Sequence, residues 1–169
     1  VNFWNNTNAI YPFVTDKTTQ GDMASQMKFN LKDFNRDKLY NVYLPPNAQE
    51  KFNYSDGDIE NKIYNILEKS NDNSVFSKEL IDQIVDWPTE YHLSPLRHNL
   101  LRHIDFKSTD NILELVCGCG AITRQLGETG ASVSAVEGSI NRAKSASTRC
   151  KDLSNVNVYV SNFQNIIFE

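Results

Sequence analysis

The stretch Asp110–Ser139, DNILELVCGCGAITRQLGETGASVSAVEGS, decides the fold. It opens with the apolar run NILELV, which is too short for a helix and predicts a strand. The turn CGCG follows, and AITRQLGETG then has helical spacing, with Gly130 as its C-terminal stop. SVSAVEGS predicts a second strand that ends at Glu137. A strand, a glycine-rich turn, a helix and another strand in this order predict a unit of a parallel sheet.

The residues after Ser139 continue this alternation of helix and strand. INRAKSASTRCKDL predicts a second helix with Ser139 as its cap, and NVNVYVSNF predicts a third strand. The fold class predicted for residues 109–169 is therefore α/β, a Rossmann-like partial parallel sheet of β-α-β-α-β order.

Residues 55–108 predict a helical lead-in to this sheet. DGDIENKIYNILEKS has apolar residues at helical spacing, with Asp58 placed to cap the helix. FSKELIDQIVDWP repeats the pattern, with Ser77 as the cap and Pro88 as the stop. LSPLRHNLLRHI begins with Ser94 as the cap and Pro95 at the first helical position, where a missing N–H is harmless. We expect Leu96, Leu100 and Ile104 to face inward.

Residues 1–54 are rich in Asn, Asp and Lys and predict an irregular or β-containing N-terminal region. Apolar and polar residues alternate weakly in two places, which favours short strands. The alternating positions are Met27, Phe29 and Leu31, and then Tyr40, Val42 and Leu44.

The composition is that of an ordinary globular protein, with 169 residues, a net charge of −4 and 40% hydrophobic residues. A mildly acidic chain with scattered Lys and Arg argues against nucleic-acid binding. No apolar stretch approaches the roughly 20 residues that span a bilayer, and no signal-peptide pattern is visible. The three cysteines argue against a disulfide framework, and Cys117 and Cys119 lack a second pair for a metal site. We expect a cytoplasmic protein without a metal ion.

The glycine-rich turn and the acid after the second strand together predict a nucleoside site. Backbone N–H groups at the start of a helix are unpaired, and glycines let a ligand approach them closely. Glu137 follows the turn by about 20 residues, where a carboxylate can accept the hydroxyls of a ribose. We therefore expect an adenosine-containing ligand at the carboxyl ends of the strands.

The loop departs from the dinucleotide pattern G-x-G-x-x-G, because Gly118 and Gly120 are followed by Thr123. An acidic residue, Glu114, lies within the first strand just before the loop. A carboxylate in this place can bind an ammonium group, so it favours a cofactor with a free amino group.

The stretch ILELVCGCGAITRQLGETGASVSAVEGS resembles motifs I and II of class I S-adenosylmethionine-dependent methyltransferases. Their loop has the pattern acidic-x-Gly-x-Gly-x-Gly, for which this chain supplies Glu114, Val116, Gly118 and Gly120. The upstream residues YSDGDIEN, SVFSKEL and DWPTEYHLSPLRHNLLR are similar to the lead-in of bacterial methyltransferases found with glycosyltransferases of surface glycans. The resemblance covers about residues 54–163.

The resemblance implies S-adenosylmethionine as the cofactor and assigns roles to the residues that match. Glu114 would orient the methionine ammonium, and the backbone from Cys117 to Gly120 would line the methionine and ribose. Glu137 would hold the ribose hydroxyls, with Gly138 beside the adenine.

Four further residues complete the site that the resemblance implies. Asn162 and Phe163 would meet the edge and face of the adenine, although the family usually has Asp at the position of Asn162. Tyr91 and Arg97 would close over the methionine carboxylate.

Two departures from the family pattern bear on function. Val116 replaces a glycine, which impairs binding if that position needs positive φ or close approach, but does not if Val116 merely extends the strand. The chain also stops after the third strand, and the strand that should pair beside the first is absent. This predicts either a fragment of a longer protein or a homo-oligomer formed through an open apolar sheet edge.

The function predicted from the resemblance is that of a methyltransferase, or of its cofactor-binding half. It would transfer a methyl group to an O or N atom of a small-molecule or glycan-precursor acceptor. No catalytic base is assigned, and the chain alone can be inactive even if the full-length parent is an enzyme. The alternative is a non-catalytic, degenerate or truncated methyltransferase-like interaction module. GCGAIT is also reminiscent of the loop of RNA adenine dimethyltransferases, against which the acidic charge argues.

Overall fold

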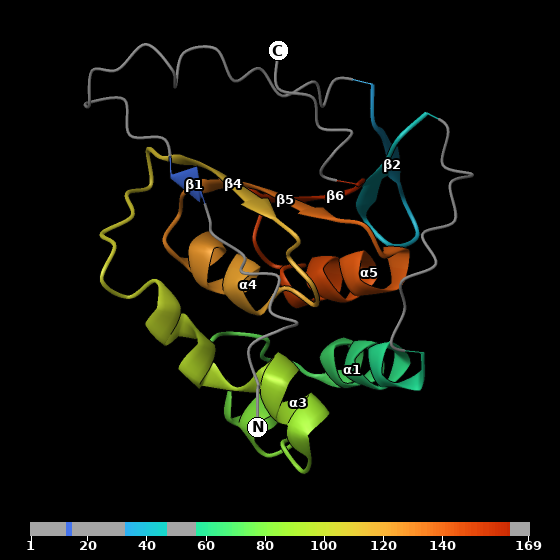
Figure 1. Ribbon diagram of the computed structural model, residues 1–169, viewed down its shortest axis with the longest axis vertical. Helices are drawn as coiled ribbons and strands as arrows, with labels where there is room; N and C mark the ends of the chain where they lie inside the picture. Colours follow the sequence, from blue (N-terminus) through green and yellow to red (C-terminus); the bar gives the residue numbers. More distant parts are fainter. Residues whose placement is uncertain (1–12, 15–32, 47–56, 163–169) are drawn as a thin grey trace, which may run out of the picture.

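The computed structural model describes residues 13–14, 33–46 and 57–162. Its centre is a mixed six-stranded sheet in the order β1-β4-β5-β6-β3-β2, so the fold has α/β character (Figure 1). Three parallel neighbours form the middle of the sheet: β4 (Asn111–Leu115), β5 (Ser132–Glu137) and β6 (Val156–Val160). Helices α4 (Ala121–Glu128) and α5 (Ile140–Arg149) connect them. The predicted β-α-β-α-β order is present.

The N-terminal region supplies the outer strands of the sheet. Strand β3 (Val42–Leu44) runs parallel to β6, and β2 (Asn35–Asp37) pairs antiparallel with β3. The alternation noted at Val42 and Leu44 therefore does mark a strand. The alternation at Met27, Phe29 and Leu31 lies outside the described residues.

The edge of β4 differs from the open edge expected from the sequence. Strand β1 (Phe13–Val14) pairs antiparallel with β4, placing Phe13 opposite Leu113 and Val14 opposite Ile112. A segment from the start of the chain thus takes the place beside β4 that was expected to be empty. This pairing could not be predicted from the sequence, because a strand of two residues carries no periodicity.

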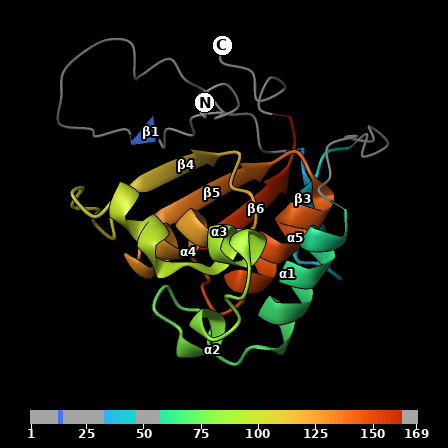
Figure 2. The same cartoon turned by 60° about the horizontal axis from the view of Figure 1, so that its bottom comes forward.

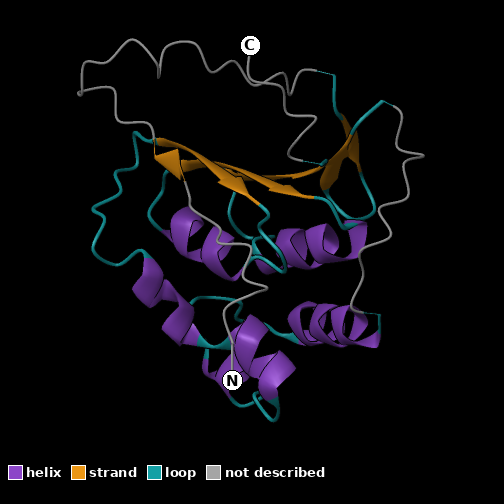
Figure 3. Cartoon of the chain, in the orientation of Figure 1, coloured by secondary structure: helices purple, strands orange, loops and turns teal. Residues whose placement is uncertain are grey.

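The helices form two layers on one face of the sheet (Figure 3). Helices α4 and α5 lie directly against the strands, because two successive right-handed crossovers in the same direction place their helices on the same face. Beneath them lie the lead-in elements, shown from another side in Figure 2. These are α1 (Asp58–Lys69), α2 (Lys78–Ile81), α3 (Trp87–Leu93) and the 3₁₀ helix η2 (Pro95–Leu100).

Two hydrophobic clusters hold these layers together. The first lies between the sheet and α4 and α5, and includes Ile112, Val133 and Val158. The second lies among the lead-in helices, and its buried members are Ile63, Leu67, Leu80, Leu93 and Cys119. Because Cys119 belongs to the turn after β4, the lead-in packs directly against that turn.

Two predicted helix boundaries in the lead-in are wrong. Helix α1 begins at Asp58 itself, after Gly57, so Asp58 does not cap it from outside. Pro88 does not end a helix but occupies the first turn of α3. There Asp86 and Thr89 form a reciprocal capping box, and a missing N–H has no consequence. Ser77 and Ser94 cap the helices that follow them, as predicted.

The inward face predicted for the last lead-in segment is wrong for Leu96 and Leu100 and right for Ile104. Leu96 and Leu100 are 65% and 62% exposed, whereas Leu101 is buried and Ile104 packs against the first cluster. The segment forms a 3₁₀ helix, in which three residues make a turn and positions four apart no longer share a face. No helix among the described residues has the length and apolarity needed to cross a membrane.

Candidate functional site

The turn of residues 116–120 connects β4 to α4 in an unusual backbone conformation. Val116, Gly118 and Gly120 have φ values of 60°, 57° and 81°. The N–H of Cys117 donates to the carbonyl of Val136 (3.0 Å), and the N–H of Gly120 donates to the carbonyl of Cys117 (3.1 Å). Left-handed backbone at alternate residues is a conformation that glycine adopts freely and β-branched residues rarely adopt.

Val116 therefore occupies a position whose backbone favours glycine. Strand β4 ends at Leu115, so the interpretation that Val116 merely extends the strand is wrong. A non-glycine residue in the left-handed region is destabilising by about 1–3 kcal/mol. The surrounding hydrogen bonds hold the turn in this conformation despite the valine.

The two glycines of the turn serve different purposes. A Cβ atom at Gly120 would lie 2.7 Å from the Cα atom of Ala146, so this glycine lets α4 and α5 pack closely. A Cβ atom at Gly118 would have no heavy atom within 4 Å. The backbone at Gly118 therefore borders open space, which is the condition for a ligand to approach it.

The two cysteines of the turn are packing residues. Cys117 lies in the cluster under the sheet, and Cys119 lies in the cluster of the lead-in helices. Burial raises the pKa of Cys117 well above its usual value and that of Cys119 to about 12, so both are thiols at neutral pH. Cys117 and Cys119, on either side of Gly118, thus anchor the turn in the two hydrophobic clusters.

Glu137 ends β5 with a buried carboxylate that binds the turn. Its Oε2 accepts a hydrogen bond from the N–H of Gly118 (2.8 Å), and its Oε1 accepts one from the N–H of Ser139 (2.9 Å). Burial raises the pKa of Glu137, while these backbone N–H groups and the positive charge of Arg142 act in the opposite direction. A carboxylate offers about four lone-pair positions, so each oxygen can accept a further hydrogen bond.

Glu114 is the second acid of the site, and one of its oxygens has no partner. The side chain is 2% exposed within β4, and Oε2 is buried without a hydrogen bond. Burial raises the pKa of Glu114 to about 8, and the negative charge of Glu137 adds to this shift. The hydroxyl of Thr123, in the first turn of α4, faces this acid and acts against the upward shift of its pKa. Neither that hydroxyl nor Oε2 of Glu114 has a partner within hydrogen-bonding geometry. Unsatisfied buried polar atoms are uncommon in proteins, and a buried acid with a strongly raised pKa is a candidate functional residue.

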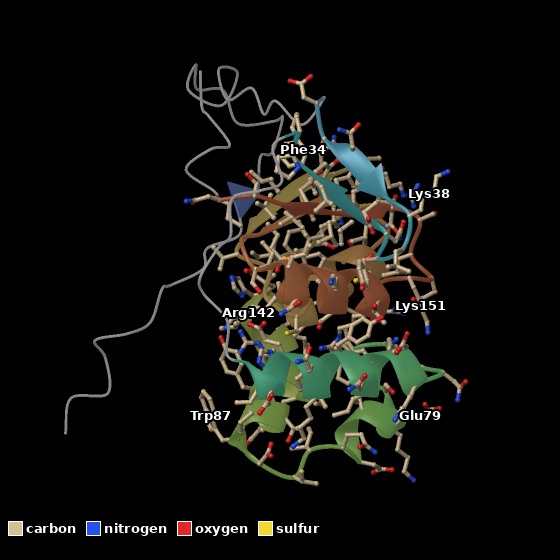
Figure 4. All side chains as sticks on the ribbon, turned by 90° about the vertical axis from the view of Figure 1, so that its right-hand side faces the viewer. Phe34, Lys38, Glu79, Trp87, Arg142 and Lys151 are labelled. Carbon is tan, nitrogen blue, oxygen red and sulfur yellow. The ribbon has the colours of Figure 1, made fainter. Side chains whose placement is uncertain are left out.

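Tyr91 and Arg97 stack on the outer surface of the lead-in. The Arg97 guanidinium carbon lies 4.4 Å from the centre of the Tyr91 ring, which in turn stacks on Trp87 at 5.4 Å. The positive charge of Arg97 also opposes the upward shift of the Glu114 pKa, so it lies within electrostatic reach of that acid. Figure 4 shows Trp87 on the same side of the molecule as Arg142, which is in the first turn of α5.

The adenine contacts are placed only in part. Gly138 is half-buried between Glu137 and Ser139, and Asn162 is half-buried just after β6. The N–H of Ser161 donates to the carbonyl of Glu137 (3.0 Å), so Asn162 follows a residue that is paired to the site. Phe163 lies outside the described residues.

Glu60 is a site residue that the sequence analysis missed. It is fully buried in α1, and its Oε1 accepts a hydrogen bond from Nε of Arg142 (2.8 Å). A signal was present in the sequence, because Glu60, Ile63 and Leu67 follow the i, i+3, i+7 spacing of the inward face of a helix. A carboxylate on such a face has to be paired, which marks it for attention.

Two surface grooves in the described part of the chain lie away from the turn. One runs between α1 and α2 and includes Asn61, Lys69 and Glu79, and the smaller one includes Tyr40, Glu60 and Lys144. Neither is lined by a residue of the 116–120 turn. We assign the site to the turn because the unpartnered acid and the accessible backbone lie there.

Comparisons of the chain with protein families, with curated proteins and with solved structures find no match.

Proposed function

We propose that the chain binds S-adenosylmethionine at the 116–120 turn and acts as a methyltransferase or as the cofactor-binding half of one. The observation that carries this proposal is the unpartnered oxygen of Glu114, buried beside a turn whose Gly118 backbone borders open space. A buried carboxyl oxygen without a partner is unfavourable, and the ammonium group of a methionine would supply that partner.

The other residues around the 116–120 turn support the proposal that a nucleoside binds there. The free lone pairs of the Glu137 carboxylate can accept hydrogen bonds from two ribose hydroxyls. Gly138 and Asn162 follow β5 and β6 at the same end of the sheet, where the adenine would lie. Arg97, held over Tyr91, offers a cation to the methionine carboxylate.

The chemistry divides between cofactor and protein. When bound, the cofactor supplies an activated methyl group, and the residues of this chain bind and orient it. The acceptor is proposed to be an O or N atom of a small molecule or glycan precursor, which rests on the resemblance of the sequence. An acceptor hydroxyl also needs a base, and we assign none.

Calorimetric titration of the protein with S-adenosylmethionine tests this proposal. We expect binding by the parent chain and at least a tenfold weaker affinity in Glu137→Gln, because a charged hydrogen-bond acceptor for the ribose is lost. Glu128→Gln is the matched control, since Glu128 lies in α4 and pairs with Arg124. No heat at millimolar ligand would contradict the proposal, and so would equal affinity in both variants.

A second candidate, a non-catalytic interaction module, is favoured by the positive φ of Val116. A turn strained by valine is what a methyltransferase-like fold that has lost its cofactor would show. Val116→Gly separates the two functions. If only the variant binds S-adenosylmethionine, the parent chain is a degenerate module, and if both bind, the valine is tolerated.

A further inference from the structure

We infer that Glu60, in the lead-in helix α1, is a positioning residue that fixes the orientation of Glu137. This inference rests on the proposed function, in which Glu137 holds the ribose. The lead-in would then contribute to cofactor binding, although it lies outside the sequence motifs around the turn.

The first link runs from α1 to the start of α5. Glu60 is fully buried, and its Oε1 accepts a hydrogen bond from Nε of Arg142 at 2.8 Å, while its Oε2 lies 3.5 Å from the hydroxyl of Ser139. The side chain of Arg142 is only 12% exposed, so the ion pair is shielded from water. Ser139 is the cap of α5, and Arg142 lies in its first turn.

The second link runs from the start of α5 to Glu137. The N–H of Ser139 donates to Oε1 of Glu137 at 2.9 Å. The positive charge of Arg142 favours the ionised form of the same carboxylate. Ser139 and Arg142 therefore both act on Glu137, whose other oxygen is held by the Gly118 N–H.

Packing alone does not explain an acid at this position. Ile63 and Leu67 lie on the same face of α1 and are fully buried in the lead-in cluster. A buried ion pair usually stabilises a fold no better than apolar residues of similar volume, but it fixes the geometry of the groups it joins. The geometry fixed by Glu60 is that of the α5 N-terminus beside Glu137.

The affinities of adenosine and 2′,3′-dideoxyadenosine, measured by NMR titration, test the inference. The parent chain is expected to prefer adenosine by about tenfold, because only adenosine has hydroxyls for Glu137. In Glu60→Gln we expect this preference to fall to twofold or less. Ile63→Ala is the matched control, because it weakens the packing of the same helix without changing Glu60, Arg142 or Ser139. This variant should retain the parent's preference for adenosine.

The outcomes distinguish the inference from the proposed function. An unchanged preference in Glu60→Gln would overturn the positioning role while leaving the nucleoside site intact. If the parent chain binds neither nucleoside, or binds both equally, the proposed site fails and the positioning role fails with it. Should Glu60→Gln not fold, Arg142→Lys keeps the charge but changes the donor geometry. A reduced preference in that variant supports the inference, and an unchanged one overturns it.

Discussion

Val116 is held at a φ of 60°, where a β-branched side chain is strained. Val116→Gly should raise the free energy of unfolding by about 1 kcal/mol, because relief of the strain exceeds the extra chain entropy that glycine loses on folding. Urea denaturation measures this change. Val116→Ala is the control, since it removes the branch but keeps a Cβ atom, and it should give a smaller gain. A less stable Val116→Gly would show that the valine side chain contributes more by packing than it loses by strain.

The raised pKa of Glu114 makes stability depend on pH. Burial raises this pKa from 4.5 to about 8, so between these values the folded chain keeps a proton that the unfolded chain releases. Stability is therefore lost as pH rises from 4.5, by roughly 3 kcal/mol at pH 7. Glu114→Gln cannot ionise, so its stability relative to the parent should grow by that amount over the same pH range.

Urea denaturation of both proteins at about pH 4.5 and pH 7 checks this prediction. Parallel pH profiles for the two proteins would contradict the raised pKa of Glu114. The same substitution should also weaken binding of S-adenosylmethionine. Glu114 is protonated in the ligand-free chain at pH 7 and would give up its proton to pair with the ammonium, whereas an amide cannot ionise.

The position of a single residue in the fold could be predicted from the sequence where that residue lies at the end of a predicted strand. Glu114 and Glu137 lie at the carboxyl ends of two neighbouring parallel strands, so both lie near the turn that follows the first of these strands. The burial of Cys117 and Cys119 in two different clusters could not be assigned in this way. It depends on the lead-in helices, which are far away in the sequence.

At the scale of elements, the contact between α4 and α5 depends on Gly120. Gly120→Ala should destabilise the protein by about 3 kcal/mol, because its Cβ would lie 2.7 Å from backbone of α5 that cannot move aside easily. Gly118→Ala is the matched comparison, with the same left-handed backbone but open space around the Cβ, and should be destabilised by about 1 kcal/mol. Equal losses of stability in thermal or urea unfolding would contradict the different roles of the two glycines.

The elements themselves were predicted with uneven success, for identifiable reasons. Strands β4 to β6 and helices α4 and α5 follow from periodicity and turn residues within a single stretch. The lead-in was harder, because Pro88 is compatible with both the end of one helix and the first turn of the next. A 3₁₀ helix at Pro95–Leu100 also has the same caps as an α-helix, so the sequence did not distinguish them.

At the scale of the whole molecule, β1 covers part of an edge that would otherwise be open. Replacing both Phe13 and Val14 by Pro should remove this pairing with β4, since proline cannot donate to a strand ladder. The freed edge should then promote self-association, which sedimentation velocity at increasing protein concentration detects. The same pair replaced by Thr, which favours strands, is the control. An equally monomeric proline variant would mean that β1 does not protect the edge.

The pairing of the outer strands of the sheet could not be predicted from the sequence. Strand β3 pairs with β6, and β1 pairs with β4, although the two partners of each pair are far apart in the sequence. Strands β1 and β3 have only two and three residues. Such pairings depend on the edges that the central strands leave available, and not on local pattern. Glu114, Gly118 and Glu137 lie around one turn because they belong to a single continuous β-α-β stretch, whereas Glu60 belongs to α1 and was not predicted.

The most direct test of the proposed nucleoside site is an NMR titration of the ¹⁵N-labelled protein with S-adenosylhomocysteine, the demethylated product of the proposed reaction. We predict that the largest shifts occur at the amides of Gly118 and Ser139, which donate to Glu137, and at their neighbours in the turn. Shifts confined to the groove between α1 and α2, or no shifts at millimolar ligand, would contradict a nucleoside site at the end of β4 and β5.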